Sequence, residues 1–450
     1  MRILIHGINF SPETTGVGKY TGEMAAWLAQ RGHEVRVITA PPHYPQWRVT
    51  SGYRAWSYQR ELNARSEGSD SPADGEAPRS KYLDVVRCPV WLPEKPTGAN
   101  RLLHLASFAL SSFPVMLGWA RWRPDVVLAI EPTLFCSVSA LLAARLCGAK
   151  AWLHVQDLEV DAAFELGDFA QSSRARRWAL AMERTLLRRF DRVSAISARL
   201  AERLIAKGVD SSRCTLLPNW VDPKVIYPQR SRNLYRDILG IGDCTVIALY
   251  AGSMGKKQGL ELLVEAARQL VQHPEIQFVL CGDGPYRPRL VELAKNLRNI
   301  ILLPLQPADR LNDLLNLAGI HLLPQRADAA DLVLPSKLTG MFASGRPVVA
   351  TAHPGTQLAM AVEGRGLVTP PADANRFASA VLRLAEDAEL RERLGRQARE
   401  YAVKYLGPDT ILAEFERALL GACNRIHEPV LQDQVSGASA EFRSRSAFEG

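Results

Sequence analysis

The chain has 450 residues, 47% of them hydrophobic and 23% charged, and its formal net charge is +8. This length exceeds what one hydrophobic core usually holds, so we expect two or three domains in a chain with the composition of a soluble globular protein. Its seven cysteines lie far apart and form no CxxC pair. Their odd number and wide spacing exclude a zinc site or a disulfide framework and predict a reducing compartment.

The basic charge invites a nucleic-acid interpretation, but the arginines and lysines are spread along the chain without the aromatic and basic stripe of such surfaces. We therefore expect no nucleic-acid partner. The densest basic cluster is 174–192, and its apolar residues at helical spacing are Trp178, Met182, Leu186 and Phe190. That spacing predicts one apolar helix face among arginines. The helix is either packed in the protein with a solvated basic side or in contact with anionic lipid.

A second segment that could meet a membrane is 102–120, which is apolar and long enough to span a bilayer. It also contains His104, several serines and an internal Pro114. We therefore expect a buried or interfacial helix and not a true span. The first residues carry one arginine and a short apolar run, so we expect no secretory signal.

Strand-like and helix-like patterns alternate through the first half of the chain. The predicted strands cover 2–8, 33–40, 125–130, 150–157, 192–197 and 214–219, and the predicted helices include 18–31 and 133–147. This alternation predicts a parallel sheet covered by helices. Residues 62–80 have almost no large apolar side chain, which predicts a disordered insertion.

The same pattern begins again near 218–223. The predicted strands of the second half cover 244–253, 276–284, 299–304, 319–324 and 346–351, and 259–272 is helix-like. The predicted organisation is an N-terminal domain over 1–218, a C-terminal domain over 219–405, a C-terminal helix at 406–428 and a disordered tail at 429–450. The C-terminal helix is expected to pack back on the N-terminal domain.

Each half places glycines between its first strand and its first helix. In the first half these are Gly16, Gly18 and Gly22. The residues around Gly18 fail the GxxxxGK[ST] phosphate-loop pattern, and the second strand ends without the acidic residue that a dinucleotide site needs. The turn is therefore either purely structural or a place where a ligand approaches the backbone at a helix N-terminus.

The second half repeats this arrangement and adds two lysines. Its glycines are Gly252, Gly255 and Gly259, and Lys256 and Lys257 lie in the same loop. Two Rossmann-like halves that each point a glycine loop at a shared cleft suit a nucleotide diphosphate. The second loop is the better phosphate holder because it carries the cations.

Three stretches carry a family resemblance: residues 1–47, GKKQGLELLVEAA (255–267) and DLVLPSKLTGMFASGRPVVAT (331–351). They resemble the colanic-acid biosynthesis glycosyltransferases of the WcaI type, which belong to glycosyltransferase family 4, and the resemblance extends to about residue 420. It implies an α/β GT-B fold, with two Rossmann-like domains facing a central cleft. It also implies a retaining transferase that moves a sugar from a nucleotide-sugar, with GDP-fucose favoured, to a lipid-linked exopolysaccharide unit.

The resemblance places the donor in the C-terminal half and the acceptor in the N-terminal half. Lys257, with Lys256 beside it, matches the family's cation on the donor pyrophosphate. Ser253 stands where the broader family has an arginine, and Gly340 stands where it has the glutamate that binds the ribose. The matched donor segments also contain Ser336, Lys337, Gly282 and Gly284, the last two in a loop expected to line the base or ribose pocket.

In the N-terminal half, His154 and Asp157 end a predicted strand, where cleft residues are expected in an open α/β sheet. The resemblance makes them candidates for contact with the sugar near its reacting carbon, although a lone histidine is more often a packed or hydrogen-bonded residue. Glu159 and Asp161 are weaker candidates. The loop 40–47 is rich in proline and aromatic residues, which suits either stacking on a sugar or capping of a core.

Catalysis by such a site needs stabilisation of the charge that develops on the leaving pyrophosphate. Lys257 and the helix N-termini after Gly18 and Gly255 are expected to supply it. The sequence has no DxD motif and its histidines are dispersed, so we expect no metal and no cofactor beyond the nucleotide-sugar substrate. Alternative functions are a GT-B nucleotide-sugar epimerase or hydrolase, or a non-catalytic nucleotide-binding protein. We expect the protein to be cytoplasmic and peripheral at the inner face of the cell membrane.

Overall fold

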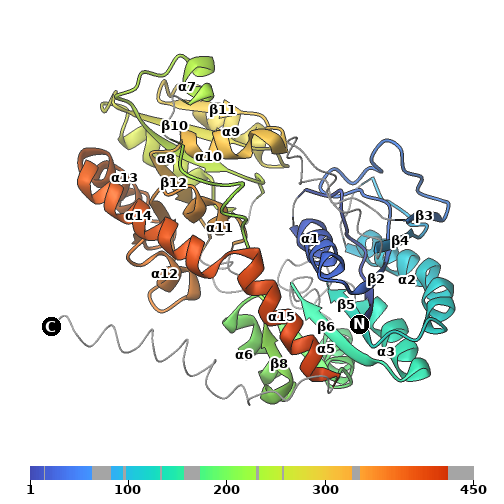
Figure 1. Ribbon diagram of the computed structural model, residues 1–450. Coiled ribbons are helices and arrows are strands. Elements are labelled where there is room, and N and C mark those ends of the chain that lie inside the picture. The colour runs from blue at the N-terminus through green and yellow to red at the C-terminus, as the bar shows by residue number, and fades with distance from the viewer. Residues whose placement is uncertain are drawn as a thin grey trace, which may run out of the picture. The chain divides into compact units, whose positions relative to one another are not determined.

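The computed structural model describes residues 1–14, 16–62, 83–94, 98–131, 134–156, 173–229, 233–255, 258–326 and 335–423. The predicted insertion, apart from Leu62, and the predicted tail at 429–450 lie outside these residues. Contacts along the chain define two compact units, Met1–Pro218 with Leu412–Gly450, and Asn219–Ile411. Figure 1 shows both units, coloured from the N-terminus to the C-terminus.

The first unit is built on an eight-stranded sheet with the order β3-β4-β2-β1-β5-β6-β7-β8. Its strands are β1 (Arg2–His6), β2 (Glu34–Thr39), β3 (Gln59–Leu62), β4 (Leu83–Arg87), β5 (Val126–Glu131), β6 (Lys150–Val155), β7 (Arg192–Ala195) and β8 (Cys214–Leu216). Among these strands, β3 pairs antiparallel with β4 and the other neighbours are parallel. Ile3, Leu4 and Ile5 are fully buried, because a parallel sheet covered on both faces needs apolar side chains on both sides of each strand.

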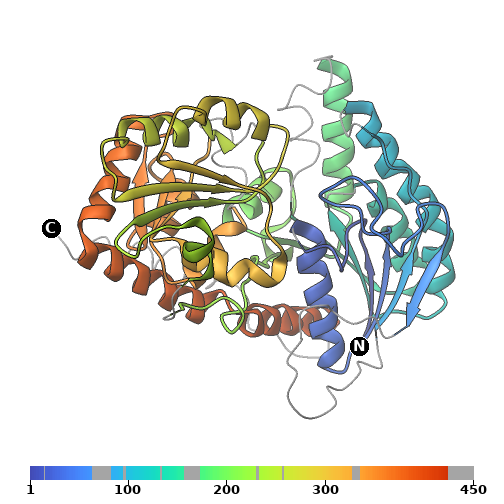
Figure 2. The same cartoon turned by 90° about the horizontal axis from the view of Figure 1, so that it is seen from above.

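Helices cover both faces of this sheet. They are α1 (Gly16–Gln30), α2 (Gly98–Ala120), α3 (Leu134–Cys147), α5 (Ser173–Leu187), α6 (Ala198–Ala206), the 3₁₀ turn η1 (Ser211–Arg213) and the last helix α15 (Pro408–Ala422). Figure 2 shows α1 on one face of the sheet and α2 and α3 on the other. From Leu412 on, α15 belongs to the first unit, where Phe415 packs edge-on against Trp152 with ring centroids 5.2 Å apart. The chain thus returns to the first unit inside α15 and not at residue 405.

The second unit contains a six-stranded parallel sheet with the order β11-β10-β9-β12-β13-β14. Its strands are β9 (Val246–Ala251), β10 (Ile276–Cys281), β11 (Ile300–Leu303), β12 (Ile320–Leu323), β13 (Val348–Thr351) and β14 (Gly366–Thr369). Its helices are α7 (Leu234–Leu239), α8 (Glu261–Gln269), α9 (Arg287–Ala294), η3 (Ala308–Arg310), α10 (Leu311–Leu317), α11 (Lys337–Ala343), α12 (Gln357–Val362), α13 (Ala374–Glu386) and α14 (Ala388–Tyr405). Phe278 and Phe377 lie in one apolar cluster of this unit, and Phe342 lies in another.

The predicted face of the basic cluster is corrected by the structure. Leu186 and Phe190 are buried, but Trp178 and Met182 are 78% and 53% exposed. The described buried positions of α5 are Glu183, Leu186 and Leu187, so Trp178 and Met182 lie outside its buried side, and Phe190 lies beyond the end of the helix at Leu187. The alternation of strands and helices was predictable, whereas the short strands β3, β4 and β14 were not among the predicted elements.

Candidate active site

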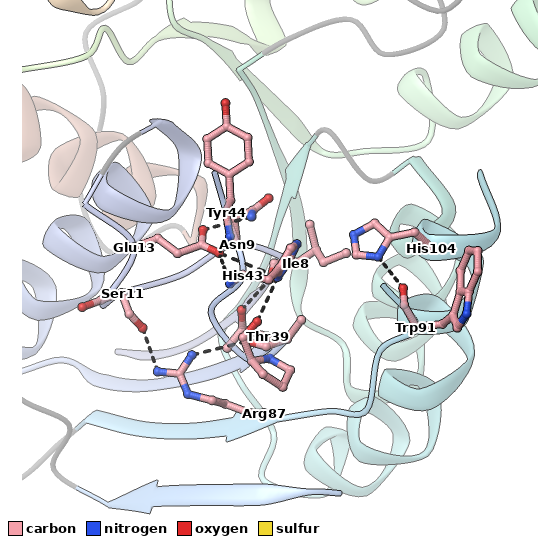
Figure 3. A network of polar contacts seen from close by, with 12 residues as sticks. Ile8, Asn9, Ser11, Glu13, Thr39, His43, Tyr44, Arg87, Trp91 and His104 are labelled. Carbon is pink, nitrogen blue, oxygen red and sulfur yellow. Dashed lines mark hydrogen bonds and ion pairs between the residues drawn. The ribbon is translucent and has the colours of Figure 1, made fainter. Parts of the chain in front are cut away.

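The first part of the candidate site lies at the carboxyl ends of β1 and β2, where the loops after the two strands meet (Figure 3). The Glu13 carboxylate accepts hydrogen bonds from the backbone amides of His43 and Tyr44, both at 3.0 Å. It also accepts one from the side chain of Asn9 at 2.9 Å. These contacts tie the loop after β1 to the loop after β2, at the sheet edge where ligands bind in open α/β folds.

The side chain of Glu13 is buried. Burial raises the pKa of Glu13, while the hydrogen bonds from His43 and Tyr44 oppose that rise without cancelling it. A buried carboxyl is tolerated because its donors replace the lost water. No local sequence pattern marks this role, since its partners come from another loop.

Gly16 and Gly18 in the first turn have different surroundings. A side chain at Gly18 would meet Glu13, with the added Cβ only 2.7 Å from the Glu13 Cβ. The close approach at Gly18 is therefore made by the protein itself, which gives this glycine a structural reason, and the approach of a ligand there stays a prediction. Gly16 has a φ of +60°, and an added Cβ would meet only the Tyr44 ring, at 3.7 Å. Of the two, Gly16 is the one with space beside it.

Arg87, at the end of β4, also holds the loops after β1 and β2, through contacts with their backbone. Its side chain is buried and donates to the carbonyl oxygens of Ser11 at 2.7 Å and Ala40 at 3.3 Å (Figure 3). It also pairs with Glu61 on β3. Its guanidinium carbon lies 4.6 Å from the ring centroid of Tyr53. Arg87 thus fixes the backbone just before Glu13, although the sequence offered no motif for it.

The aromatic loop 40–47 packs on the core of the first unit, which is one of its two predicted roles, and stacking on a sugar stays a prediction. The His43 ring is buried, with its centroid 5.0 Å from that of His104, and Trp47 lies 5.2 Å from His104. Burial lowers the pKa of His104 to about 4 and also lowers the pKa of His43, so both rings are neutral near pH 7. The Tyr44 ring is 42% exposed and points away from the Glu13 carboxylate in Figure 3.

His154 occupies a packed position on β6. It is buried, and its Nδ1 lies 3.0 Å from the Ser194 hydroxyl, which also accepts a hydrogen bond from the Trp152 indole at 3.0 Å. Burial lowers the pKa of His154 to about 4. These contacts favour the packed alternative, and a direct contact with the sugar stays a prediction. Asp157, its predicted partner, lies outside the described residues.

The second part of the candidate site lies at the carboxyl end of β9. The Lys337 ammonium, at the start of α11, donates to the Tyr250 hydroxyl at 3.1 Å and lies 4.3 Å from the centroid of that ring. The Tyr250 hydroxyl in turn donates to the carbonyl of Ser253 at 2.6 Å. Burial lowers the pKa of Lys337 to about 8, because its amine is surrounded by protein even though part of the side chain is exposed. In the part of the chain that the structure describes, no carboxylate pairs with Lys337.

Next to Lys337, glycines allow the backbone of the loop after β9 to pack against the backbone of the loop after β10. A Cβ at Gly252 would lie 2.9 Å from the Lys337 Nζ, and one at Gly282 would overlap the carbonyl oxygen of Gly252. A Cβ at Gly284 would lie 2.5 Å from the Met254 oxygen. All three glycines have positive φ values. Their binding roles stay predictions, but their conformations have a packing reason.

The remaining predicted donor residues are partly described. Ser253 and Ser336 are exposed, and Gly340 lies within α11 with Leu315 as the nearest neighbour of an added Cβ, at 3.3 Å. Lys256 and Lys257 lie outside the described residues. Lys337, Ser253 and Gly252 therefore come together at one sheet edge, and Gly282 lies against them. No group of three His, Cys, Asp or Glu side chains suited to a metal occurs among the residues that the structure covers.

Comparison with known proteins gives the class of this chain. A family model for a glycosyl transferase 4-like domain matches residues 15–220, and one for glycosyl transferases group 1 matches residues 231–401. WcaI of Escherichia coli (strain K12), a glycosyl transferase named for colanic acid biosynthesis, is 40% identical over 94% of this chain and 100% of its own length.

Solved structures show the same fold. Sucrose-phosphate synthase of Thermosynechococcus elongatus matches with a TM-score of 0.69 at 19% identity, over 94% of this chain and 99% of the other. HepE of Anabaena, solved in complex with UDP, matches with a TM-score of 0.65 at 16% identity, over 94% and 100%. Together with the two parallel-sheet units, these matches define a glycosyltransferase with the α/β GT-B fold, which confirms the predicted fold class. The chain belongs to the glycosyl transferase family that the 4-like and group 1 domains define, with WcaI among its relatives.

Proposed function

We propose that this glycosyltransferase binds a nucleotide-sugar on its second unit and transfers the sugar, with retention, to a saccharide acceptor on its first unit. The observation that carries the proposal is the Lys337 ammonium, which lies beside Gly252, and Gly282 packs against the Gly252 carbonyl. Its described partners are the neutral Tyr250 hydroxyl and ring. A poorly solvated cation at backbone loops is suited to a diphosphate, because charge-assisted hydrogen bonds replace the lost hydration.

The reaction that we propose needs little covalent work from the protein. The bond between the anomeric carbon and the diphosphate oxygen breaks, a bond to an acceptor hydroxyl oxygen forms, and the acceptor proton leaves with the diphosphate. Lys337 and Lys257 stabilise the leaving charge, and Lys256 and Ser253 lie in the same loop. His154 and Asp157 are our candidates for contact with the sugar. No metal or further cofactor is part of this scheme.

The donor that we favour is GDP-fucose, and the acceptor is a lipid-linked oligosaccharide of a colanic-acid-like exopolysaccharide. The support is the 40% identity to a relative named for colanic acid biosynthesis. The structure of HepE with UDP keeps uridine nucleotides as the alternative donors. A lipid-linked acceptor would place the protein at the inner face of the cell membrane, on the cytoplasmic side.

The acceptor side of the proposal is supported by the loop 40–47. The exposed Tyr44 ring lies beside Gly16, the glycine with open space, and sugars commonly pack against aromatic faces. Glu13 and Arg87 would act as positioning residues for this loop, because they hold its backbone and do not face solvent.

A product analysis tests the proposed function against its alternatives. The purified protein is incubated with GDP-fucose and with a panel of other GDP- and UDP-sugars, each with and without membrane-extracted lipid-linked saccharide. We expect nucleoside diphosphate release and a lengthened saccharide only when the acceptor is present. Equal sugar release without acceptor would identify a hydrolase, and an altered nucleotide-sugar would identify an epimerase. Binding without turnover of any donor would leave a nucleotide-binding protein.

A further inference from the structure

Two neighbouring helices of the first unit present apolar side chains to solvent. On α2, Leu103 is 58% and Leu110 is 77% exposed; on α3, Val138 is 56% and Leu146 is 64% exposed. The two helices pack along each other, as Figure 1 shows. We call this surface the apolar face and define it as Leu103, Leu110, Phe113, Phe135, Val138 and Leu146.

The spacing shows that the exposed side of each helix is mainly apolar, with Arg145 in the last turn of α3. On α2 the exposed residues Leu103, Leu110 and Phe113 recur at intervals of a helix face, and on α3 Val138 and Leu146 do the same. Tyr58 extends the surface, because its hydroxyl donates to the Ser111 carbonyl on α2 at 2.7 Å. That contact brings an exposed loop with Trp56 beside the helix.

The helices of the second unit show what an ordinary solvent face of this protein looks like. Arg376, Arg383 and Glu386 occupy the outer side of α13, and Glu392 and Arg396 occupy that of α14. Scattered apolar residues on a surface need no explanation, but a continuous apolar face marks an interaction site. The apolar face of α2 and α3 therefore differs from the described outer sides of α13 and α14, which carry these charged residues.

The solvent-facing charges described on α2, α3 and α5 are basic. Among the residues whose side chains the structure describes, these helices carry four arginines, Arg101, Arg145, Arg177 and Arg184. Their one acidic residue, Glu183, is buried and paired with Lys207. The exposed Trp178 and Met182 lie on α5, which contacts α3. Apolar side chains among arginines match a bilayer surface with anionic headgroups.

Helix α2 is long and apolar enough over Asn100–Ala120 to cross a membrane, with a mean hydropathy of 1.4. Its inner side, however, is part of the first unit: Ser112 lies 2.9 Å from the His6 ring nitrogen, and His104 donates to the Trp91 carbonyl at 2.7 Å. Phe108 is fully buried and its ring centroid lies 5.5 Å from that of His6. A spanning helix would have to leave these contacts, so lipid can reach α2 only along its outer side.

We propose that the apolar face docks on an anionic phospholipid bilayer, with α2 and α3 lying along the surface. The proposal rests on the proposed function in one respect, since a lipid-linked acceptor is found at such a surface. It commits to lipid because the solvent-facing charges described on α2, α3 and α5 are basic, whereas a second copy of the same face would bring like charges together.

Vesicle co-sedimentation of the full chain tests the docking. We compare vesicles of neutral phosphatidylcholine with vesicles that also contain phosphatidylglycerol, at low and at high salt. The wild type should bind the anionic vesicles, and high salt should release it, because a salt concentration of about 1 M shortens the Debye length to roughly 3 Å. The two double variants are L103D with L110D on α2, and V138D with L146D on α3, all at exposed positions. Each pair should lower the partition onto anionic vesicles at least about tenfold.

The control is V291D with V403D, two exposed apolar residues of the second unit, and it should bind vesicles like the wild type. Thermal stabilisation by nucleoside diphosphate should be equal in all variants, which separates loss of docking from loss of donor binding. Unchanged vesicle binding in both test pairs would overturn the proposal. So would a wild-type dimer that the test pairs dissociate, or protein that only detergent extracts from membranes.

Discussion

Replacing Gly18 with alanine tests the contact between the first glycine turn and Glu13. The added Cβ would lie 2.7 Å from the Glu13 Cβ, which is not a flexible side-chain end that could move away cheaply. Glu13 is also held by three hydrogen bonds, from His43, Tyr44 and Asn9. The substitution must therefore displace the carboxylate or the start of α1.

The magnitude follows from two opposing effects. Overpacking costs about 1–3 kcal/mol, and alanine in place of glycine in a helix returns roughly 0.5–1 kcal/mol. We expect Gly18→Ala to lower the free energy of unfolding by about 1–2 kcal/mol. For a unit of this size, that corresponds to a melting temperature lower by roughly 2–8 °C.

Thermal and urea unfolding measure this effect, with Gly118→Ala as the matched control. Gly118 lies in α2, and an added Cβ there would meet nothing within 4 Å. The control should be as stable as the wild type or slightly more stable. A Gly18→Ala protein with wild-type stability but no turnover would refute the reasoning, because the turn would then serve ligand approach and not the contact with Glu13.

Three further outcomes follow. Arg87→Met should lower the free energy of unfolding by about 2–3 kcal/mol in urea titration, because it leaves the carbonyls of Ser11 and Ala40 without the Arg87 donor. An unchanged unfolding midpoint would contradict the role of Arg87 in holding these loops. Nucleoside diphosphate binding, measured by calorimetry across pH, should weaken as the pH rises through about 8, because Lys337 loses its charge above its pKa of about 8. A Lys337→Met protein should show no such weakening near pH 8. Lys257→Ala should lower kcat/KM by about 100-fold, while Lys19→Ala, whose lysine pairs with Glu23, should cost less than about tenfold; the reverse order would assign the donor to the first unit.

The sequence predicted those parts of the fold that depend on local pattern. Buried strands such as β1 and β9 are continuous apolar runs, so their positions and the two α/β halves could be read directly. Strand β4 was missed because it is short and follows a polar stretch. The outer face of α5 was misjudged because helical spacing does not show which part of a helix the protein covers, and because α5 ends at Leu187, before Phe190.

The candidate site was predictable only where a motif or a family resemblance marked it. Lys337 was found through its segment, but its partner Tyr250 comes from another strand and carries no signal of its own. Glu13 and Arg87 were missed for the same reason, since each acts on backbone atoms of distant loops. The glycines were found, but whether a neighbour or a ligand fills the space beside each one depends on tertiary packing.

The central claim is that Lys337 provides a charge for the donor diphosphate, and calorimetry at pH 7 tests it most directly. Binding of guanosine, GDP, uridine and UDP is compared for the wild type, Lys337→Met and the control Lys295→Met, an exposed lysine just after α9. A charged hydrogen bond is worth about 1.5–3 kcal/mol, so Lys337→Met should weaken diphosphate binding roughly 10- to 150-fold and leave nucleoside binding unchanged. The Lys295→Met control should bind like the wild type. Equal diphosphate affinity in Lys337→Met and the wild type would contradict the claim.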